Sequence, residues 1–202
     1  MDTAALKMEA LAWLRFGKKL HYVSTEAGYW NADVLGASLT QSVEVEVKVS
    51  KADLKREFTS KREKHFLYQQ ASEGVTTTRS VPNYFYFYVP EKLEQEAKEI
   101  VAAEAPKAGL AVYYGHYAPG TDKNTKVIIK AKKLHDRPPT EVFLDTLLKR
   151  MGSELCGRHL VDYNIRQGVL QQLTHMSQVI GETLRDQSWT PDFEMGRTVD
   201  GD

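Results

Sequence analysis

The chain has 202 residues, of which 27 are basic and 27 acidic, so its formal net charge at pH 7 is zero. A hydrophobic fraction of 42% without an 18-residue apolar run excludes collagen-like, wholly disordered and membrane-spanning proteins. The single cysteine, Cys156, cannot form an internal disulfide, and the N-terminal residues lack the pattern of a secretory signal. We therefore expect a cytoplasmic protein.

The first 40 residues predict a helix followed by a hairpin. Apolar side chains recur at helical spacing through residues 3–20, and Gly17 followed by two lysines is typical of a helix end. Two short strands, 21–24 and 32–38, are predicted on either side of the turn-rich segment 26–31.

Residues 43–49 (VEVEVKV) form the clearest strand of the chain, because apolar and charged side chains alternate without a break. Ser50 follows as a helix N-cap, with Asp53 at the third helical position. A strongly basic helix is then predicted over 51–70, and the polar, threonine-rich segment 72–80 is typical of a mobile loop.

The later elements complete an α/β pattern. In order, we predict a strand at 84–89, a helix at 91–105, strands at 108–114 and 126–132, and helices at 141–150 and 155–186. Strands that alternate with helices imply some parallel pairing. We expect a central mixed β-sheet flanked by helices, with a domain at 1–150, an α-helical C-terminal extension at 151–187 and a disordered tail at 188–202.

Charged side chains on the strand 43–49 point to a metal site. Glu44, Glu46 and Lys48 share one face of the strand, and the neighbouring helices are expected to bury that face. Asp33 lies at the start of a neighbouring strand. Two carboxylates on adjacent strands suit Mg²⁺, which binds one or two carboxylates, waters and a substrate phosphate. A lysine beside them could orient or deprotonate the attacking water, or stabilise charge on the phosphate.

Two segments, 31–34 (NADV) and 45–48 (VEVK), together resemble the PD-(D/E)XK nuclease superfamily. Its motif is an acid at a hairpin bend and then (D/E)-X-K on the next strand, and the family proline before the acid is Ala32 here. Residues 46–54, the basic helix after them and 82–91 (PNYFYFYVPE) resemble the MmcB-like DNA-repair nucleases, a bacterial and phage branch. The resemblance covers about residues 5–150 and implies a restriction-endonuclease-like core.

This resemblance implies a DNA nuclease that depends on Mg²⁺ or Mn²⁺ and acts in DNA repair, recombination or phage DNA metabolism, in a bacterial or phage-infected cell. The residues it assigns to catalysis are Asp33, Glu46, Lys48 and Glu26, and the metal ligands are Asp33, Glu46 and the peptide carbonyl of Val47. Glu26 takes the place of an extra acid ahead of the motif, and Glu9 on the opening helix is the less favoured candidate for that place.

The zero net charge hides a basic first part, because residues 1–150 carry 23 basic and 19 acidic side chains while 151–202 carry 4 and 8. Within the basic helix, Lys51, Lys55 and Arg62 are the expected phosphate contacts of bound DNA.

Two alternatives remain open from the sequence. One is a non-catalytic nucleic-acid-binding module on the same fold, and the other is a phage structural or interaction protein that assembles through its C-terminal helices. The helix at 155–186 has apolar residues at three- and four-residue steps, so it can pack on the core or on a second copy. We expect DNA and a homodimer partner, and no membrane.

Overall fold

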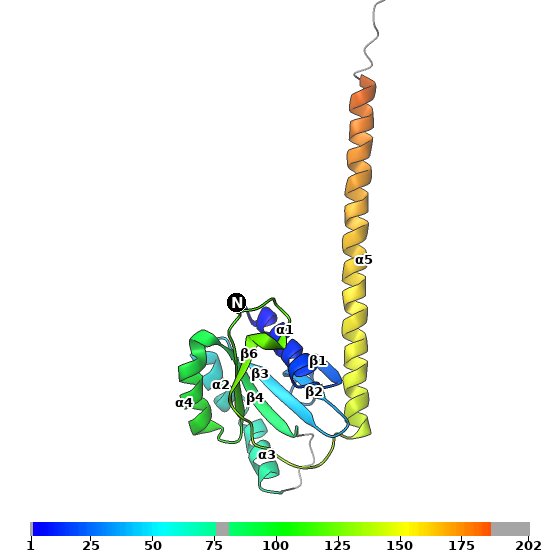
Figure 1. Ribbon diagram of the computed structural model, residues 1–202. Helices are drawn as coiled ribbons and strands as arrows, with labels where there is room; N and C mark the ends of the chain where they lie inside the picture. The colour runs from blue at the N-terminus through cyan, green and yellow to red at the C-terminus, as the bar shows by residue number, and fades with distance from the viewer. Residues whose placement is uncertain (1, 76–80, 187–202) are drawn as a thin grey trace, which may run out of the picture. The chain divides into compact units, whose positions relative to one another are not determined.

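The computed structural model describes residues 2–75 and 81–186 (Figure 1). Within these ranges six strands form one mixed sheet, in the spatial order β1-β2-β3-β4-β5-β6. Helices flank the sheet, and a long helix forms the C-terminal extension. The fold is therefore α/β, as predicted. The tip of the predicted mobile loop, 76–80, and the predicted tail at 188–202 lie outside the described residues.

The elements follow the predicted order. The first half comprises α1 (Thr3–Ala12), a π-helical turn η1 (Trp13–Gly17), β1 (Tyr22–Ala27), β2 (Ala32–Ala37), β3 (Ser42–Val47), α2 (Lys51–Ser60) and α3 (Arg62–Ser72). The second half comprises β4 (Tyr84–Pro90), η2 (Glu91–Leu93), α4 (Glu94–Glu104), β5 (Gly109–Tyr113), η3 (Asp122–Asn124), β6 (Thr125–Ile129) and α5 (Glu141–Asp186).

The strand pairing combines a meander with crossovers. Strands β1, β2 and β3 are antiparallel neighbours, because short turns connect them. Strand β4 pairs parallel with β3 after the crossover through α2 and α3, and β5 pairs parallel with β4 after α4. Strand β6 returns antiparallel on β5. The predicted parallel pairing is confirmed.

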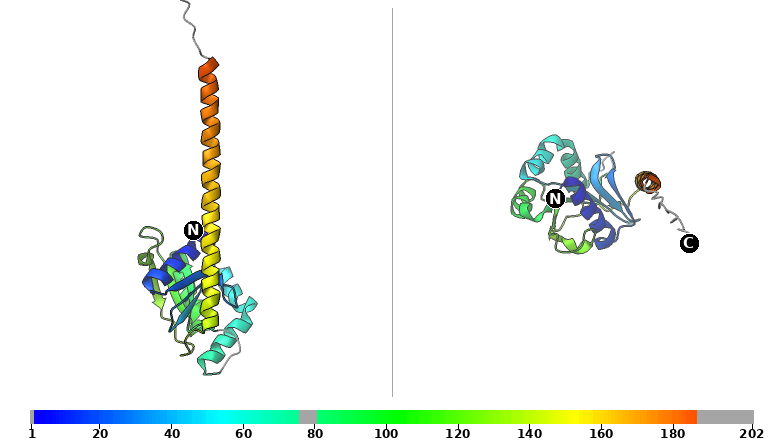
Figure 2. Two further views of the ribbon diagram at one scale, coloured as in Figure 1. Left: turned by 90° about the vertical axis from the view of Figure 1, so that its right-hand side faces the viewer. Right: turned by 90° about the horizontal axis from the view of Figure 1, so that it is seen from above.

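Other elements cover both faces of β3, as we predicted from the helices on either side of this strand in the sequence. Its valines pack with Leu6, Trp13 and Leu14 of the N-terminal helical segment and with Tyr86 and Tyr88 of β4. The opposite face of β4 packs against α2, α3 and α4, which lie together on that side of the sheet (Figures 1 and 2). Every residue of β3 is buried, so its charged side chains must find partners inside the protein.

The prediction of one basic helix over 51–70 is wrong. The helix ends at Ser60 and a new one starts at Arg62, because Lys61 leaves the helical region with φ −115° and ψ 37°. The N-cap prediction is confirmed, since Ser50 Oγ accepts the backbone N–H of Asp53 at 3.2 Å. The break at Lys61 turns α3 so that it runs over the charged face of β3.

The predicted separation of helices 141–150 and 155–186 is also wrong, because α5 runs unbroken from Glu141 to Asp186. Gly152 is accommodated inside the helix, where glycine costs about 1 kcal/mol relative to alanine. On either side of it, Leu147 is buried and the Glu154 carboxylate accepts hydrogen bonds from Thr25. These contacts anchor the start of α5 on the sheet.

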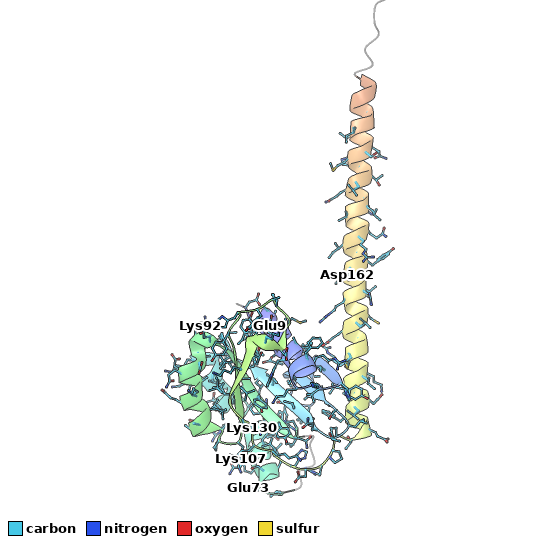
Figure 3. The ribbon with its side chains drawn as sticks, viewed as in Figure 1. Glu9, Glu73, Lys92, Lys107, Lys130 and Asp162 are labelled. Atoms are coloured by element: carbon cyan, nitrogen blue, oxygen red, sulfur yellow. The ribbon has the colours of Figure 1, made fainter. Side chains whose placement is uncertain are left out.

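The chain divides into two compact units, Met1–Leu155 and Cys156–Asp202. In the second unit the described helical side chains are exposed (Figure 3, where Asp162 is labelled). Along residues 2–75 and 81–186, no helix combines the length and the apolar character that a bilayer crossing requires.

Candidate functional site

Two charged residues of β3 and the lysine directly after it face α2 and α3 and lie in a buried cluster. Glu44, Glu46 and Lys48 are 5%, 1% and 7% exposed. They point away from the valine face, as the strand alternation predicted. Buried charges are costly unless they are paired, so the cluster depends on partners from the two helices.

Lys64 of α3 is the central cation of this cluster and is fully buried. Its Nζ lies 2.6 Å from Glu46 Oε1, 2.7 Å from Glu44 Oε1 and 3.4 Å from Glu57 Oε1. Tyr68, one turn further along α3, donates its hydroxyl to Glu44 Oε2 at 2.7 Å. Three carboxylates therefore share one ammonium group.

Glu57 of α2 holds the lysine of the E-x-K motif. Lys48 Nζ lies 2.8 Å from Glu57 Oε2 and 3.4 Å from Glu46 Oε2. Lys61, at the break between α2 and α3, adds a contact of 2.8 Å to Glu46. His65 Nε2 lies 3.5 Å from Glu57 on its other side.

The charges in this cluster reinforce one another electrostatically. Burial alone would raise the pKa of Glu46, but Lys64 and Lys61 outweigh it and hold that pKa below its ordinary value. The pKa of Glu57 is lowered against the effect of burial by His65, Lys64 and Lys48. Burial would lower the pKa of Lys48, yet Glu57 and Glu46 raise it. Both acids and the lysine are therefore charged at neutral pH.

Asp33 meets β3 at the point where the regular β2–β3 pairing ends. The last backbone pair in that direction is Val34 with Val45. Beyond it, the Asp33 carboxylate takes the place of a strand carbonyl and accepts the backbone N–H of Val47 at 2.8 Å. Val47 is the middle residue of the E-x-K motif, so the fold joins the acid at the hairpin to the motif on the next strand.

Lys7 of α1 connects Asp33 to Glu26. Its Nζ lies 2.8 Å from Asp33 Oδ1 and also contacts Glu26 Oε1. Asn31 Nδ2 donates to the other Glu26 oxygen at 2.8 Å. Glu26 and Asn31 both have positive φ, of 48° and 51°, which non-glycine residues adopt infrequently. Glu26 lies in β1, one residue before its end at Ala27, and so outside the turn in which the sequence places it. The structure brings Glu26 and Asp33 together through one lysine.

Glu9, the other candidate for an extra acid, lies elsewhere. It is buried on α1 and accepts the backbone N–H of Gly120 at 2.9 Å, on the η3 side of the sheet (Figure 3). The geometry therefore favours Glu26 over Glu9 as the acid beside Asp33.

The residues predicted to hold a metal offer oxygen donors of the right kind. Asp33 and Glu46 each carry a carboxylate, and Mg²⁺ needs one or two of these when waters and phosphate complete its shell. Different lysines occupy them: Lys7 contacts Asp33, whereas Lys61 and Lys64 contact Glu46. In the part of the chain that the structure describes, no group of three or more His, Cys, Asp and Glu side chains could hold a metal ion. The two carboxylates are therefore of the kind that Mg²⁺ binds, and in the structure each is paired with its own ammonium groups.

The predicted phosphate contacts lie at the surface. Lys51 and Lys55 are exposed on α2, and Arg62 is exposed at the start of α3. Because α2 begins directly after the E-x-K strand, these side chains project from the elements that carry the charged cluster.

Sequence reasoning missed the partners of the motif. From the sequence, Glu57 and Lys64 are members of the basic helix without a role in the site, and the resemblance assigns no role to Glu44. The sequence does contain one signal for this pair: Glu57 and Lys64 are seven positions apart, which places both on the same face of a continuous helix. That signal is misleading in detail, because the break at Lys61 separates the two residues onto different helices.

Comparisons with known proteins yield one distant structural likeness. No family model matches the chain, and no curated protein matches it. Among solved structures, it is similar to the SPO1766 protein of unknown function from Silicibacter pomeroyi, at 13% identity and a TM-score of 0.46. The likeness covers 78% of this chain and 88% of that one. It assigns no family and no activity.

Proposed function

We propose that the protein is a metal-dependent DNA nuclease that hydrolyses phosphodiester bonds. One observation carries the proposal: Asp33 Oδ2 accepts the N–H of Val47, between Glu46 and Lys48. An acid at a hairpin end thereby meets an E-x-K strand, which is the arrangement of the PD-(D/E)XK motif. The sequence resemblance and the strand order also favour a nuclease.

In this proposal Asp33, Glu46 and the carbonyl of Val47 hold Mg²⁺ or Mn²⁺. When bound, such a cation supplies Lewis-acid stabilisation of the charge that develops on the scissile phosphate. Lys48 contributes a positive charge beside Glu46, held in place by the 2.8 Å contact with Glu57. Glu26 lies beside Asp33 and keeps Lys7 within reach of both acids. Lys7 and Lys61 then become available to the negatively charged substrate when a cation takes their acids.

Lys51, Lys55 and Arg62 are proposed to contact the DNA backbone. Exposed lysine and arginine side chains position DNA through its phosphates without reading its sequence. Their exposure on α2 and α3 leaves them free of the buried cluster. DNA affinity should therefore fall steeply with salt, and each phosphate contact that is removed should reduce that salt dependence.

The test is cleavage of supercoiled, linear duplex, branched and single-stranded DNA by the purified full chain, with Mg²⁺, Mn²⁺ or EDTA. Asp33→Asn keeps an oxygen that can accept the Val47 N–H but loses the charge, so it should fold and cleave about 100-fold more slowly or not at all. Asp145→Ala removes an exposed acid of α5 and is the matched control. Full activity of Asp33→Asn, or cleavage that persists in EDTA, would overturn the proposal.

A DNA-binding module without cleavage is the second candidate. The observation that favours it is the complete engagement of the Glu46 carboxylate by Lys61, Lys64 and Lys48. The same experiment separates the two candidates, because a binding module would shift DNA in a gel without cutting it under any metal condition.

We further propose that α5 pairs with a second copy of the chain. Six apolar side chains follow one stripe of the helix, namely Val161, Ile165, Val169, Leu173, Met176 and Ile180. All six are about half exposed or more, so this stripe is not covered within the described residues. A homodimer would bury the stripe and supply two sites, which suits cutting of both DNA strands.

A further inference from the structure

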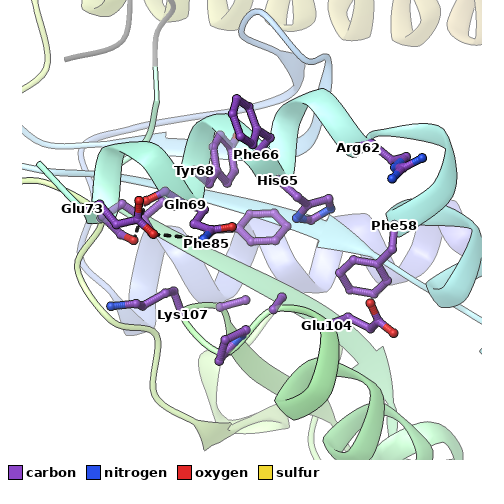
Figure 4. Close-up of a pocket in the computed structure, with 15 residues that line it drawn as sticks. Phe58, Arg62, His65, Phe66, Tyr68, Gln69, Glu73, Phe85, Glu104 and Lys107 are labelled. Carbon is purple, nitrogen blue, oxygen red and sulfur yellow. Dashed lines mark hydrogen bonds between the residues drawn. The ribbon is translucent and has the colours of Figure 1, made fainter. Parts of the chain in front are cut away.

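A cavity lies between α3 and the turn that joins α4 to β5 (Figure 4). Its volume is about 430 Å³. Pockets that bind small molecules have volumes of roughly 300–1,000 Å³. All of its lining residues belong to the unit Met1–Leu155.

Aromatic side chains dominate the walls of the cavity. Phe58, His65, Phe66, Tyr68 and Phe85 all line it. Several of these rings also contact each other: the ring centroids of Phe58 and His65 are 4.9 Å apart, and those of Tyr68 and Phe85 are 5.4 Å apart. Tyr68 and Phe85 are nearly buried by this packing, whereas Phe66 is 59% exposed, so the wall of the cavity presents aromatic surface. Such surfaces bind planar rings by stacking.

Charged and hydrogen-bonding side chains also line the cavity. Arg62 and Lys107 line it, and neither side chain forms an ion pair with a described residue. Glu73 also lines it, but accepts a hydrogen bond from Gln69 at 3.0 Å. Glu104 adds a carboxylate at the α4 side (Figure 4). The lining therefore offers aromatic rings and hydrogen-bond groups, together with two cations and the Glu104 carboxylate that have no ion-pair partner among the described residues.

We propose that this cavity binds the base of an unpaired nucleotide, with Arg62 or Lys107 contacting its phosphate. A nucleotide combines a flat aromatic base, which has polar edges, with a negatively charged phosphate that Arg62 or Lys107 can contact. An aliphatic side chain would use neither the stacking surfaces nor the cations. This inference rests on the proposed function, because the base belongs to the DNA that the site cleaves.

The cavity is joined to the charged cluster by His65. This ring lines the cavity, while its Nε2 lies 3.5 Å from Glu57. Glu57 in turn holds Lys48. A base in the cavity would therefore lie one side chain away from the residue that positions the E-x-K lysine, which favours substrates with unpaired or extruded nucleotides over regular duplex.

Calorimetric titration of the full chain in EDTA tests the inference, with dAMP, dCMP and dTMP as ligands and deoxyribose 5-phosphate as the baseless control. We expect saturable binding of the nucleotides with a Kd below about 1 mM, and none of the sugar phosphate. Phe66→Ala should weaken binding about fivefold or more. Phe16→Ala is the matched control, because Phe16 and Phe66 are both 59% exposed and Phe16 lies outside the cavity.

Arg62→Gln provides a second exposed variant and should weaken nucleotide binding more than binding of the free nucleoside. The inference is overturned if no nucleotide binds, if deoxyribose 5-phosphate binds equally well, or if Phe66→Ala binds like the parent chain. Since the titration needs no metal, it distinguishes the two proposals. Base binding without cleavage would refute only the proposed nuclease activity. Cleavage without base binding would refute only the proposed nucleotide binding in the cavity.

Discussion

Lys64 Nζ lies 2.6 Å from Glu46 Oε1, in the interior of the protein, although the two residues are 18 positions apart in the chain. The same ammonium group also neutralises Glu44 and Glu57. The fold thus places one lysine where three carboxylates converge. This arrangement makes Lys64 the residue on which the stability of the charged cluster depends.

Replacement of Lys64 by methionine should destabilise the protein by about 3–5 kcal/mol, since three buried carboxylates would lose their common partner. Urea unfolding at pH 7 measures the change in free energy. Lys92→Met is the control, because Lys92 is exposed on η2 and its loss should change stability by less than about 0.5 kcal/mol. Combining Lys64→Met with Glu44→Gln should recover part of the loss. A Lys64→Met protein as stable as the parent chain would contradict this account.

Stability should fall as the pH drops below about 5. The pKa of Glu57 and that of Glu46 are lower in the folded protein than in the unfolded chain, where glutamate titrates near 4.3. Their contribution is therefore complete above the unfolded pKa and is lost as the pH falls towards the folded pKa. The measurement is the urea midpoint between pH 7 and pH 3.

Glu57→Gln gives the matched comparison for this pH dependence. At pH 7 it should be less stable than the parent chain, because Lys48 loses its 2.8 Å partner. The difference should shrink towards pH 3, where the parent Glu57 also loses charge stabilisation. A difference that stays constant over this range would show that the Glu57 charge does not contribute.

Lys7→Met should make the melting temperature of the protein depend on divalent cations. In EDTA the variant should melt several degrees lower than the parent chain, since Asp33 and Glu26 lose the ammonium group between them. Addition of Mn²⁺ should raise its melting temperature more than that of the parent, because the cation no longer competes with Lys7. Lys7→Arg keeps the charge and should show the smaller, parent-like response. Equal Mn²⁺ shifts in all three proteins would argue against a metal at Asp33.

The apolar stripe of α5 should control oligomeric state. Replacing Ile165 and Leu173 by glutamate should convert a dimer into a monomer, measured by light scattering. The control changes Gln167 and Gln171 to glutamate, which adds the same charge on the opposite side of the helix. A chain ending at Leu155 should remain folded and monomeric, because it retains the Glu154 contacts with Thr25. An unchanged mass in the stripe variant would exclude pairing through this face.

Local patterns predicted most of the secondary structure. The alternation in 43–49 correctly predicted a strand with valines on one face and charges on the other, although β3 already ends at Val47. The Ser50 cap correctly predicted the start of α2. The two helix errors have tertiary causes. Lys61 breaks the basic helix where its side chain reaches Glu46, and α5 continues through Gly152 because Leu147 and Glu154 hold it on the sheet.

The sequence by itself determined the α/β class and the order of the elements, because these follow from spacing along the chain, and it singled out Asp33, Glu46 and Lys48 as candidate site residues. Only the tertiary structure decided which charges are buried and which lysine holds which acid. Lys64 and Lys55 look alike in the basic segment, yet one is fully buried and the other is exposed. The difference arises from where α3 crosses β3, since the pairing of buried charges depends on distances between elements that sequence spacing does not specify.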